Sequence, residues 1–220
     1  MDGQKELSLR GRVFQKIRAD ILNGKYKNHD ELREIVIGDE LGVSRTPVRE
    51  ALRQLELEGL VEIIPNKGAY VTGISEKDVQ DIYLIRSRLE GLAARMAAEN
   101  ISEEDLAEME EAIILQEFNL GKAKQNHVVE LDSKFHEVLY RASGSRILEH
   151  TLTDYHQYVQ SARTRSVRTR ERAQKSVEEH RAILEAIRSH DKDLAEKLAH
   201  EHIVHVVVNL ERQKKSREED

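Results

Sequence analysis

Cysteine is absent from the 220 residues, which excludes disulfides, thiolate metal ligands and cysteine nucleophiles. Tryptophan is also absent and aromatic residues make up only 4%, so the core must be built from Leu, Ile, Val and Ala, which suits helices. The only two prolines, Pro47 and Pro65, leave the last two thirds of the chain free of the strongest helix breaker. No apolar run approaches the ~18–20 residues that cross a bilayer, and residues 1–12 lack the apolar core of a signal peptide. These absences predict a mainly helical, cytoplasmic protein without a membrane partner.

The net charge of −6 is unevenly distributed. Residues 1–74 carry 12 basic and 12 acidic side chains, so the negative excess lies in the remainder of the chain. A DNA-binding protein needs basic side chains on its docking face and need not be basic overall. The total charge therefore neither supports nor excludes DNA as a partner.

Three helices are predicted in the first part of the chain. Apolar residues recur at helical spacing over 9–23, and Asn23-Gly24 is a stop signal. A short helix fits 34–41 and ends at Gly42. A third helix is expected to begin with Thr46 as N-cap and Pro47 in the first turn, and to run to Glu58.

Two short β-rich runs follow these helices. Residues 60–64 and 69–72 flank a Pro-Asn-Lys-Gly turn, a pattern typical of a hairpin. The order of three helices and a hairpin predicts an N-terminal winged helix-turn-helix over residues 1–74.

The remainder of the chain is predicted to form an antiparallel all-α bundle over residues 75–212, followed by a frayed charged tail at 213–220. Ser102 before three acidic residues is a strong helix start, and Ser143-Gly144 and His190-Asp191 are breaks. The six expected helices cover residues 76–99, 103–120, 123–142, 145–166, 170–189 and 191–212.

The helix-turn-helix carries a candidate DNA-reading surface. Arg45, Arg49 and Arg53 are spaced i, i+4, i+8 and share one face of the third helix. Arginines there can donate to guanine or clamp phosphate, although such a stripe can also be a solvated face. Hydroxyls at the helix start and the wing tip supply further contacts. The predicted DNA-binding residues are Ser44, Arg45, Thr46, Arg49, Arg53, Lys67 and Gly68.

This stretch resembles the GntR family of regulators. The matching run includes Leu41-Gly42-Val43-Ser44-Arg45-Thr46-Pro47-Val48-Arg49-Glu50-Ala51-Leu52 and Gly68-Ala69-Tyr70-Val71. The resemblance implies that Arg45 and Arg49 contact a double-stranded operator. Two positions depart from the family pattern: Asn28-His29 replaces the usual Pro-Gly, and Ile35 stands where some relatives place a DNA-contacting arginine.

Polar residues occupy the inner stripes of three predicted helices in the second part. Asp132 and His136 are spaced i, i+4 on one helix, His180 lies on the stripe of another, and His202 on that of the last. Neutral imidazoles with a carboxylate suit Zn²⁺, Ni²⁺, Fe²⁺ or Mn²⁺. A lone inward histidine is more often a hydrogen-bonded core residue, and His205, one turn from His202, is a rival ligand.

The same residues resemble the FCD effector domain found in the FadR branch of the GntR family. The resemblance runs over about residues 75–212 and includes Asp132-x-x-x-His136, Glu179-His180-Arg181 and a later His202. It implies that the metal ligands are Asp132, His136, His180 and His202, and that the metal is a divalent transition ion, with zinc the first choice.

Arg86 and Asn209 are the predicted effector-binding residues. Arg86 lies on an inner stripe in an R-x-x-L-E pattern that in the family can face the effector cavity, and arginine suits a carboxylate. The alternative is an Arg86–Glu90 pair that only ties helices together. Asn209 continues the stripe of His202.

Together these features predict a homodimeric repressor that releases a pseudo-palindromic operator in response to a small carboxylate metabolite bound at the metal. A metal-free effector pocket is the first alternative. Three histidines and a carboxylate also serve metal-dependent enzymes, but no arrangement of base and nucleophile accompanies them, so no enzymatic activity is expected.

Overall fold

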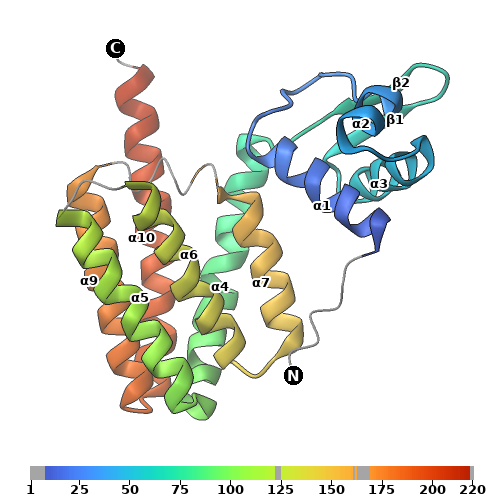
Figure 1. Cartoon of the computed structure of the whole chain (residues 1–220). Coiled ribbons are helices and arrows are strands. Elements are labelled where there is room, and N and C mark those ends of the chain that lie inside the picture. Colours follow the sequence, from blue (N-terminus) through green and yellow to red (C-terminus); the bar gives the residue numbers. More distant parts are fainter. Residues whose placement is uncertain (1–7, 122–124, 161, 163–168, 219–220) are drawn as a thin grey trace. The chain divides into compact units, whose positions relative to one another are not determined.

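The computed structural model describes residues 8–121, 125–160, 162 and 169–218. The chain divides into two compact units, Met1–Ser75 and Glu76–Asp220 (Figure 1). Among the described residues, the first unit contains three helices and a two-stranded antiparallel sheet, and the second contains only helices. The predicted fold class, a winged helix-turn-helix followed by a helical bundle, is confirmed.

The first unit is built around the apolar faces of its three helices. Val13, Ile17 and Ile21 are buried on one side of the first helix, as their spacing predicts. Val48 and Leu55 of the third helix are fully buried. The elements are α1 (Leu9–Leu22), α2 (Glu34–Leu41), α3 (Arg45–Leu57), β1 (Val61–Ile64) and β2 (Gly68–Val71).

Two glycines shape the turn between α2 and α3. Gly42 ends α2 in the left-handed region at φ +65°, where a side chain is disfavoured. A Cβ on Gly38 would lie 2.9 Å from the carbonyl oxygen of Val43, so only glycine allows the turn to fold this closely against α2. The prediction that Thr46 caps α3 was wrong, because Ser44 is the N-cap residue. Pro47 still lies in the first turn, where backbone N–H groups need no intrahelical acceptor.

The segment before α2 adds a further contact to the hairpin. The backbone N–H of His29 donates to Val71 (2.8 Å), and that of Leu32 donates to Ala69 (2.8 Å). Glu31 and Tyr70 form an isolated antiparallel bridge. His29 adopts φ +70°, a left-handed conformation, at the position where the family pattern has glycine.

The second unit is a bundle in which the helices pack side by side (Figure 1). The first of them contacts four others, and its most extensive contact is with the last. The apolar core includes Phe135, Tyr140 and Leu184, all fully buried. The described helices are α4 (Glu76–Asn100), α5 (Glu103–Gly121), α6 (Gln125–Ala142), α7 (Arg146–Tyr158), α9 (Arg170–Arg188) and α10 (Lys192–Glu218).

The packing of α4 against α10 relies on small side chains. Ala94 and Ala97 are fully buried, and a Cβ on Gly91 would lie 3.0 Å from the carbonyl oxygen of Glu196. Helix α10 continues to Glu218, so the expectation of a frayed tail after residue 212 was wrong. Lys214 supports this extension through an ion pair with Glu76 at 2.6 Å.

The predicted helix over residues 145–166 ends earlier, at Tyr158, and its expected last turns fall partly on residues 161 and 163–168, which lie outside the described part of the chain.

Among the described residues, no helix combines the length and the apolar character that crossing a membrane requires.

Candidate functional site

The predicted DNA-binding residues are exposed at the N-cap of α3, along α3 and in the hairpin of the first unit. Arg45, Arg49 and Arg53 project from successive turns of α3 and line a groove of about 570 Å³. Gly68, at the start of β2, lines the same groove. The structure therefore brings the recognition-helix arginines and the wing to one surface, while Lys67 lies in the exposed hairpin turn beside them.

One carboxylate pairs with two of these arginines. Arg49 donates to Glu34 through Nε and Nη2, both at 2.8 Å, and Arg45 donates to the same carboxylate at 3.3 Å. The hydrogen bond from Arg49 is the main reason that the pKa of Glu34 lies below its usual range. Arg45 and Arg49 remain 60% and 50% exposed, so the guanidinium groups are held in place without being hidden.

The same groove has an apolar edge on α2. Ile35 and Val36 line it, and both are more than half exposed. Ile35 occupies the position where some relatives have arginine, so this part of α2 offers the groove a hydrocarbon surface in place of a charge.

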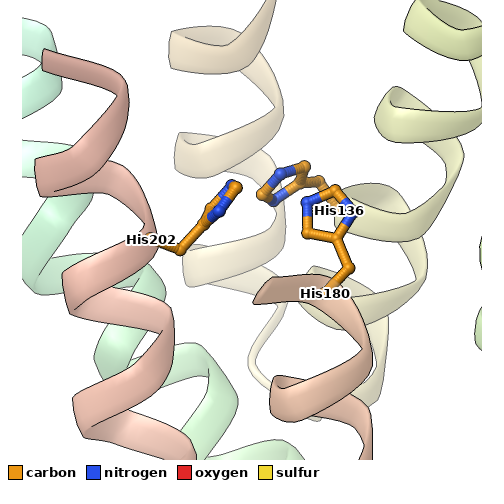
Figure 2. Close-up of side chains that lie close together, drawn as sticks. All are labelled: His136, His180 and His202. Carbon is orange, nitrogen blue, oxygen red and sulfur yellow. The ribbon is translucent and has the colours of Figure 1, made fainter. Parts of the chain in front are cut away.

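In the second unit, three histidines converge from three helices. His136 of α6, His180 of α9 and His202 of α10 are buried, and one ring nitrogen of each lies within 4.8 Å of the others (Figure 2). Figure 2 shows the three rings directed toward a common point. The closest ring centroids, those of His180 and His202, are 4.7 Å apart.

Hydrogen bonds fix which ring nitrogens face this point. His202 Nδ1 lies 2.7 Å from Glu179 Oε2, and a carboxylate can only accept, so His202 carries its hydrogen on Nδ1. His180 Nδ1 lies 3.2 Å from Gln116 Oε1. The amide of Gln116 is oriented by its own donation to the carbonyl of Val128 at 3.4 Å. The Nε2 atoms of His180 and His202 are therefore left with lone pairs for a metal.

His136 is held by a different acid. Its Nδ1 lies 2.9 Å from Glu90 Oε2, although the approach lacks the direction of a good hydrogen bond. Asp132, one turn earlier on α6, is buried and its Oδ1 lies 3.6 Å from His180 Nε2. The predicted ligands thus lie together, with the three histidines forming the cluster and Asp132 next to it.

The surroundings of His180 and His202 favour the neutral form of both imidazoles. Burial is the largest cause that lowers the pKa of His180 well below its usual value, and the neighbouring His202 lowers it further. Burial also lowers the pKa of His202, against the opposing effect of Glu179. His180 Nε2 is a buried nitrogen without a hydrogen-bond partner among the described residues. Three buried imidazoles with a nearby carboxylate fit the donor set of a divalent transition metal.

Two other predicted or rival residues lie farther out on α10. His205 is half exposed and its Nδ1 lies 2.9 Å from Glu179 Oε1, so it contacts the acid that orients His202 and lies outside the cluster. Asn209 is half-buried and lies about two turns beyond His202.

Arg86 is completely buried in a polar network around Glu90. It donates to Glu90 Oε1 through Nε and Nη2, at 2.9 and 2.5 Å, and Tyr140 donates to the same oxygen at 2.8 Å. His156 Nδ1 lies 3.3 Å from Arg86 Nη2. Burial alone would raise the pKa of Glu90, but Arg86 and His136 together hold it far below its usual range.

Several residues of this site were missed or undervalued in the sequence. Glu90 and Glu179 each connect a histidine of the cluster to a buried arginine, and Gln116 orients a third histidine. The only signal for Glu179 was its place directly before His180, and nothing in the sequence distinguishes Gln116 from other polar residues of α5. The structure gives roles to Glu90 and Glu179, which the sequence analysis names without a role at the cluster, and adds Glu34, Gln116, Tyr140, His156 and Arg172.

Comparison with known proteins agrees with both units. Residues 9–71 match the family described as bacterial regulatory proteins, gntR family, and residues 81–205 match the FCD domain. The chain is 31% identical over 202 residues to the HTH-type transcriptional regulator YdhC of Bacillus subtilis, covering 88% of this chain and 90% of that protein. It is 27% identical over 191 residues to the transcriptional repressor RspR of Escherichia coli, covering 87% and 84%.

The fold also matches solved structures. The structure of E. coli McbR/YncC superposes with a TM-score of 0.77 at 22% sequence identity, covering 94% of this chain and 99% of that one. A regulator from Rhodococcus sp. RHA1 gives a TM-score of 0.70 at 20% identity, covering 93% and 98%. The similarity extends over both units.

Proposed function

The chain belongs to the GntR family of bacterial regulatory proteins, and from this premise we propose that it is a repressor whose affinity for its operator is controlled by a small organic acid bound at a metal centre in the FCD domain. It is a DNA-binding transcriptional regulator and not an enzyme. The observation that carries the regulatory part is the cluster of three buried imidazoles next to a carboxylate. In this proposal residues 1–74 bind DNA, residues 75–212 bind the effector and form the dimer, and residues 213–220 are a charged tail.

The DNA contacts are assigned to the exposed face of α3 and to the wing. Arg45 and Arg49 reach bases or phosphates after exchanging Glu34 for the DNA, and Arg53 adds a phosphate contact one turn later. The hydroxyls of Ser44 and Thr46 donate to phosphate oxygens at the start of α3. Lys67 and Gly68 bring the wing to the backbone or minor groove.

A homodimer would present two recognition helices to the two half-sites of a pseudo-palindrome. Helix α4 offers a surface for such pairing, because Leu84, Ile85 and Leu92 are 40–65% exposed along it. A second copy that covers these side chains would remove apolar surface from water. Sedimentation of the purified protein, with Leu84→Glu as the disrupted variant, tests this assignment.

The residues that would hold the metal are His136, His180, His202 and Asp132. When bound, a divalent ion of the zinc, nickel, iron or manganese type supplies a Lewis-acidic centre for the oxygens of an acid. Gln116 and Glu179 hold their histidines in the tautomer that presents Nε2, so the site needs little rearrangement to accept the ion. An effector that binds one arrangement of the helices better than another shifts the population of DNA-binding states.

The DNA part is tested by selecting bound fragments from a genomic library with the purified full-length protein. A shared pseudo-palindromic sequence among the selected fragments is the expected result, and binding without any sequence preference would contradict the proposal. The metal part is tested by elemental analysis of untagged protein, with His180→Ala compared with the parent. We expect the variant to hold less metal and to unfold at a lower temperature, and equal metal content would refute this part.

A second candidate keeps DNA binding and has a metal-free polar pocket. Its supporting observation is that the carboxylate of Glu90 lies 2.9 Å from His136 Nδ1, so this histidine has a charged neighbour without an ion. Untagged protein that contains no transition metal and yet responds to an acid would favour this alternative.

A further inference from the structure

A second buried arginine lies beside the histidine cluster, in the first turn of α9. The side chain of Arg172 is only 8% exposed. Its Nη2 donates to Glu179 Oε2 at 3.0 Å. Its Nε and Nη1 are buried, and neither has a hydrogen-bond partner in the part of the chain that the structure describes.

This arrangement is costly for a structural arginine. A buried donor without an acceptor costs free energy, and more when the group is charged. Arg181, on the same helix, shows the ordinary solution: it is exposed and donates through both Nε and Nη2 to Glu117. Arg172 has one carboxylate, and that carboxylate also accepts from His202 and His205. The guanidinium of Arg172 therefore has donor capacity that the described residues do not use.

The position of Arg172 connects it to the cluster. Two contacts in series, 3.0 Å from Arg172 Nη2 to Glu179 Oε2 and 2.7 Å from that oxygen to His202 Nδ1, link the two side chains. The positive charge of Arg172 also contributes to the lowered pKa of His180. Arg172 is thus connected through Glu179 to a histidine of the cluster, and its charge acts on another.

Arg86, the arginine that the sequence suggests for an effector, is engaged more completely. Its Nε and Nη2 both donate to Glu90 Oε1, and Nη2 also lies within 3.5 Å of the hydroxyl of Tyr140. Only Nη1 of Arg86 lacks a partner among the described atoms. Two nitrogens are unused on Arg172, so it is the better prepared of the two to receive an anion.

We propose that Arg172 binds the carboxylate of the effector, with Nε and Nη1 donating to its oxygens, while a second oxygen-bearing group of the same molecule faces the histidine cluster. This inference rests on the proposed function and specifies the ligand class: a small hydroxy acid, oxo acid or dicarboxylic acid. Arginine recognises a planar carboxylate through directed, charge-assisted hydrogen bonds. An acid with a single functional group can satisfy the arginine or the cluster, but not both.

The test uses the full-length, metal-loaded protein and three variants. Arg172→Lys keeps a positive charge for Glu179 and removes Nε and Nη1 as donors. Arg181→Lys is the matched control on the exposed side of the same helix, and Arg86→Lys tests the rival residue. Metal content is measured by elemental analysis, and binding of acetate, malate and citrate by calorimetry.

We expect all the proteins to retain their metal and the wild-type protein to bind malate or citrate more tightly than acetate. Arg172→Lys should bind these acids roughly ten- to a hundredfold more weakly, which corresponds to the loss of hydrogen bonds to a charged group. Arg181→Lys should bind them as the wild-type protein does.

Three results would overturn the inference. Unchanged acid binding by Arg172→Lys, with or without a loss in Arg86→Lys, would remove Arg172 from the ligand site. Loss of metal in Arg172→Lys would assign it a structural role through Glu179. If metal-loaded wild-type protein bound none of the acids, the effector part of the proposed function would fail together with this inference, whereas the first two results leave the proposed function intact.

Discussion

The buried pair of Arg86 and Glu90 allows a quantitative prediction. Both side chains are 1% exposed, so neither charge has water to replace a lost partner. Glu90→Gln keeps the shape of the side chain and an oxygen that can still accept from Tyr140, but it removes the negative charge. Breaking a buried ion pair from one side costs about 3–5 kcal/mol, because the remaining charge is uncompensated.

For a chain of this size, such a loss lowers the melting temperature by about 6–20 °C. The loss should be smaller in Arg86→Met/Glu90→Gln than in Glu90→Gln alone, because the double variant leaves no unpaired charge. Unfolding is measured by urea titration in the presence of a chelator. Because Glu90 contacts His136, its substitution could change metal binding, and the chelator removes that contribution from the measured stability. The midpoint should shift without a change in the slope.

The ion pair between Arg188 and Glu110 is a suitable control. It joins α9 to α5 in the same bundle, with side chains 37% and 42% exposed. Exposed pairs contribute about 0–1 kcal/mol, so Glu110→Gln should change the midpoint little. If Glu90→Gln and Glu110→Gln destabilised the protein equally, the reasoning about burial would be refuted.

Four further predictions follow from the structure. Arg49→Ala should weaken operator binding and reduce the salt dependence by about one counterion, as measured by fluorescence anisotropy at several salt concentrations; an unchanged slope would argue against a phosphate contact. Glu34→Gln should raise the affinity for non-specific DNA more than the affinity for the operator, because Glu34 competes with phosphates for Arg45 and Arg49; an equal change in both affinities would contradict this competition. Gly38→Ala should destabilise the first unit by about 1–3 kcal/mol, because its Cβ would lie 2.9 Å from a carbonyl oxygen, and an unchanged urea midpoint would count against this close approach. Removal of metal with a chelator should lower the melting temperature of the wild-type protein, with recovery on adding Zn²⁺; a chelator that left the melting curve unchanged would speak against a metal centre that stabilises the fold.

The order of the elements could be predicted from local signals in the sequence. Ser102 accepts from the backbone N–H of Asp105 at 3.0 Å, which is the capping contact that its position before three acids indicates. The N-cap of α3 was placed two residues late, because Ser44 and Thr46 are both good capping residues by type. Residues 29–32 pair with β2. Their sequence shows no alternation of polar and apolar residues, so this pairing could not be predicted.

The histidine cluster could also be predicted from local signals in the sequence. Helical spacing places His136, His180 and His202 on the inner faces of their helices, and inner faces of a bundle meet. The roles of the residues around the three histidines could not be predicted, because they depend on contacts between helices. The same spacing rules cannot say that Gln116 of α5 reaches His180, or that Glu179 turns toward His202.

The carboxylate of Glu34 has a consequence for how such a regulator searches a genome. About 10⁶–10⁹ non-specific sites compete with an operator, and they hold the protein almost entirely through phosphates. Arg45 and Arg49 already have an acid in place, so a phosphate must displace it before it gains a full contact. In the proposed contact, a non-specific site offers only phosphates in exchange for this acid, whereas an operator also offers base edges that can accept from a guanidinium bidentately. By competing with phosphates for the two arginines, Glu34 would shorten the time that the protein spends bound to non-specific sequences relative to the time it spends on its operator.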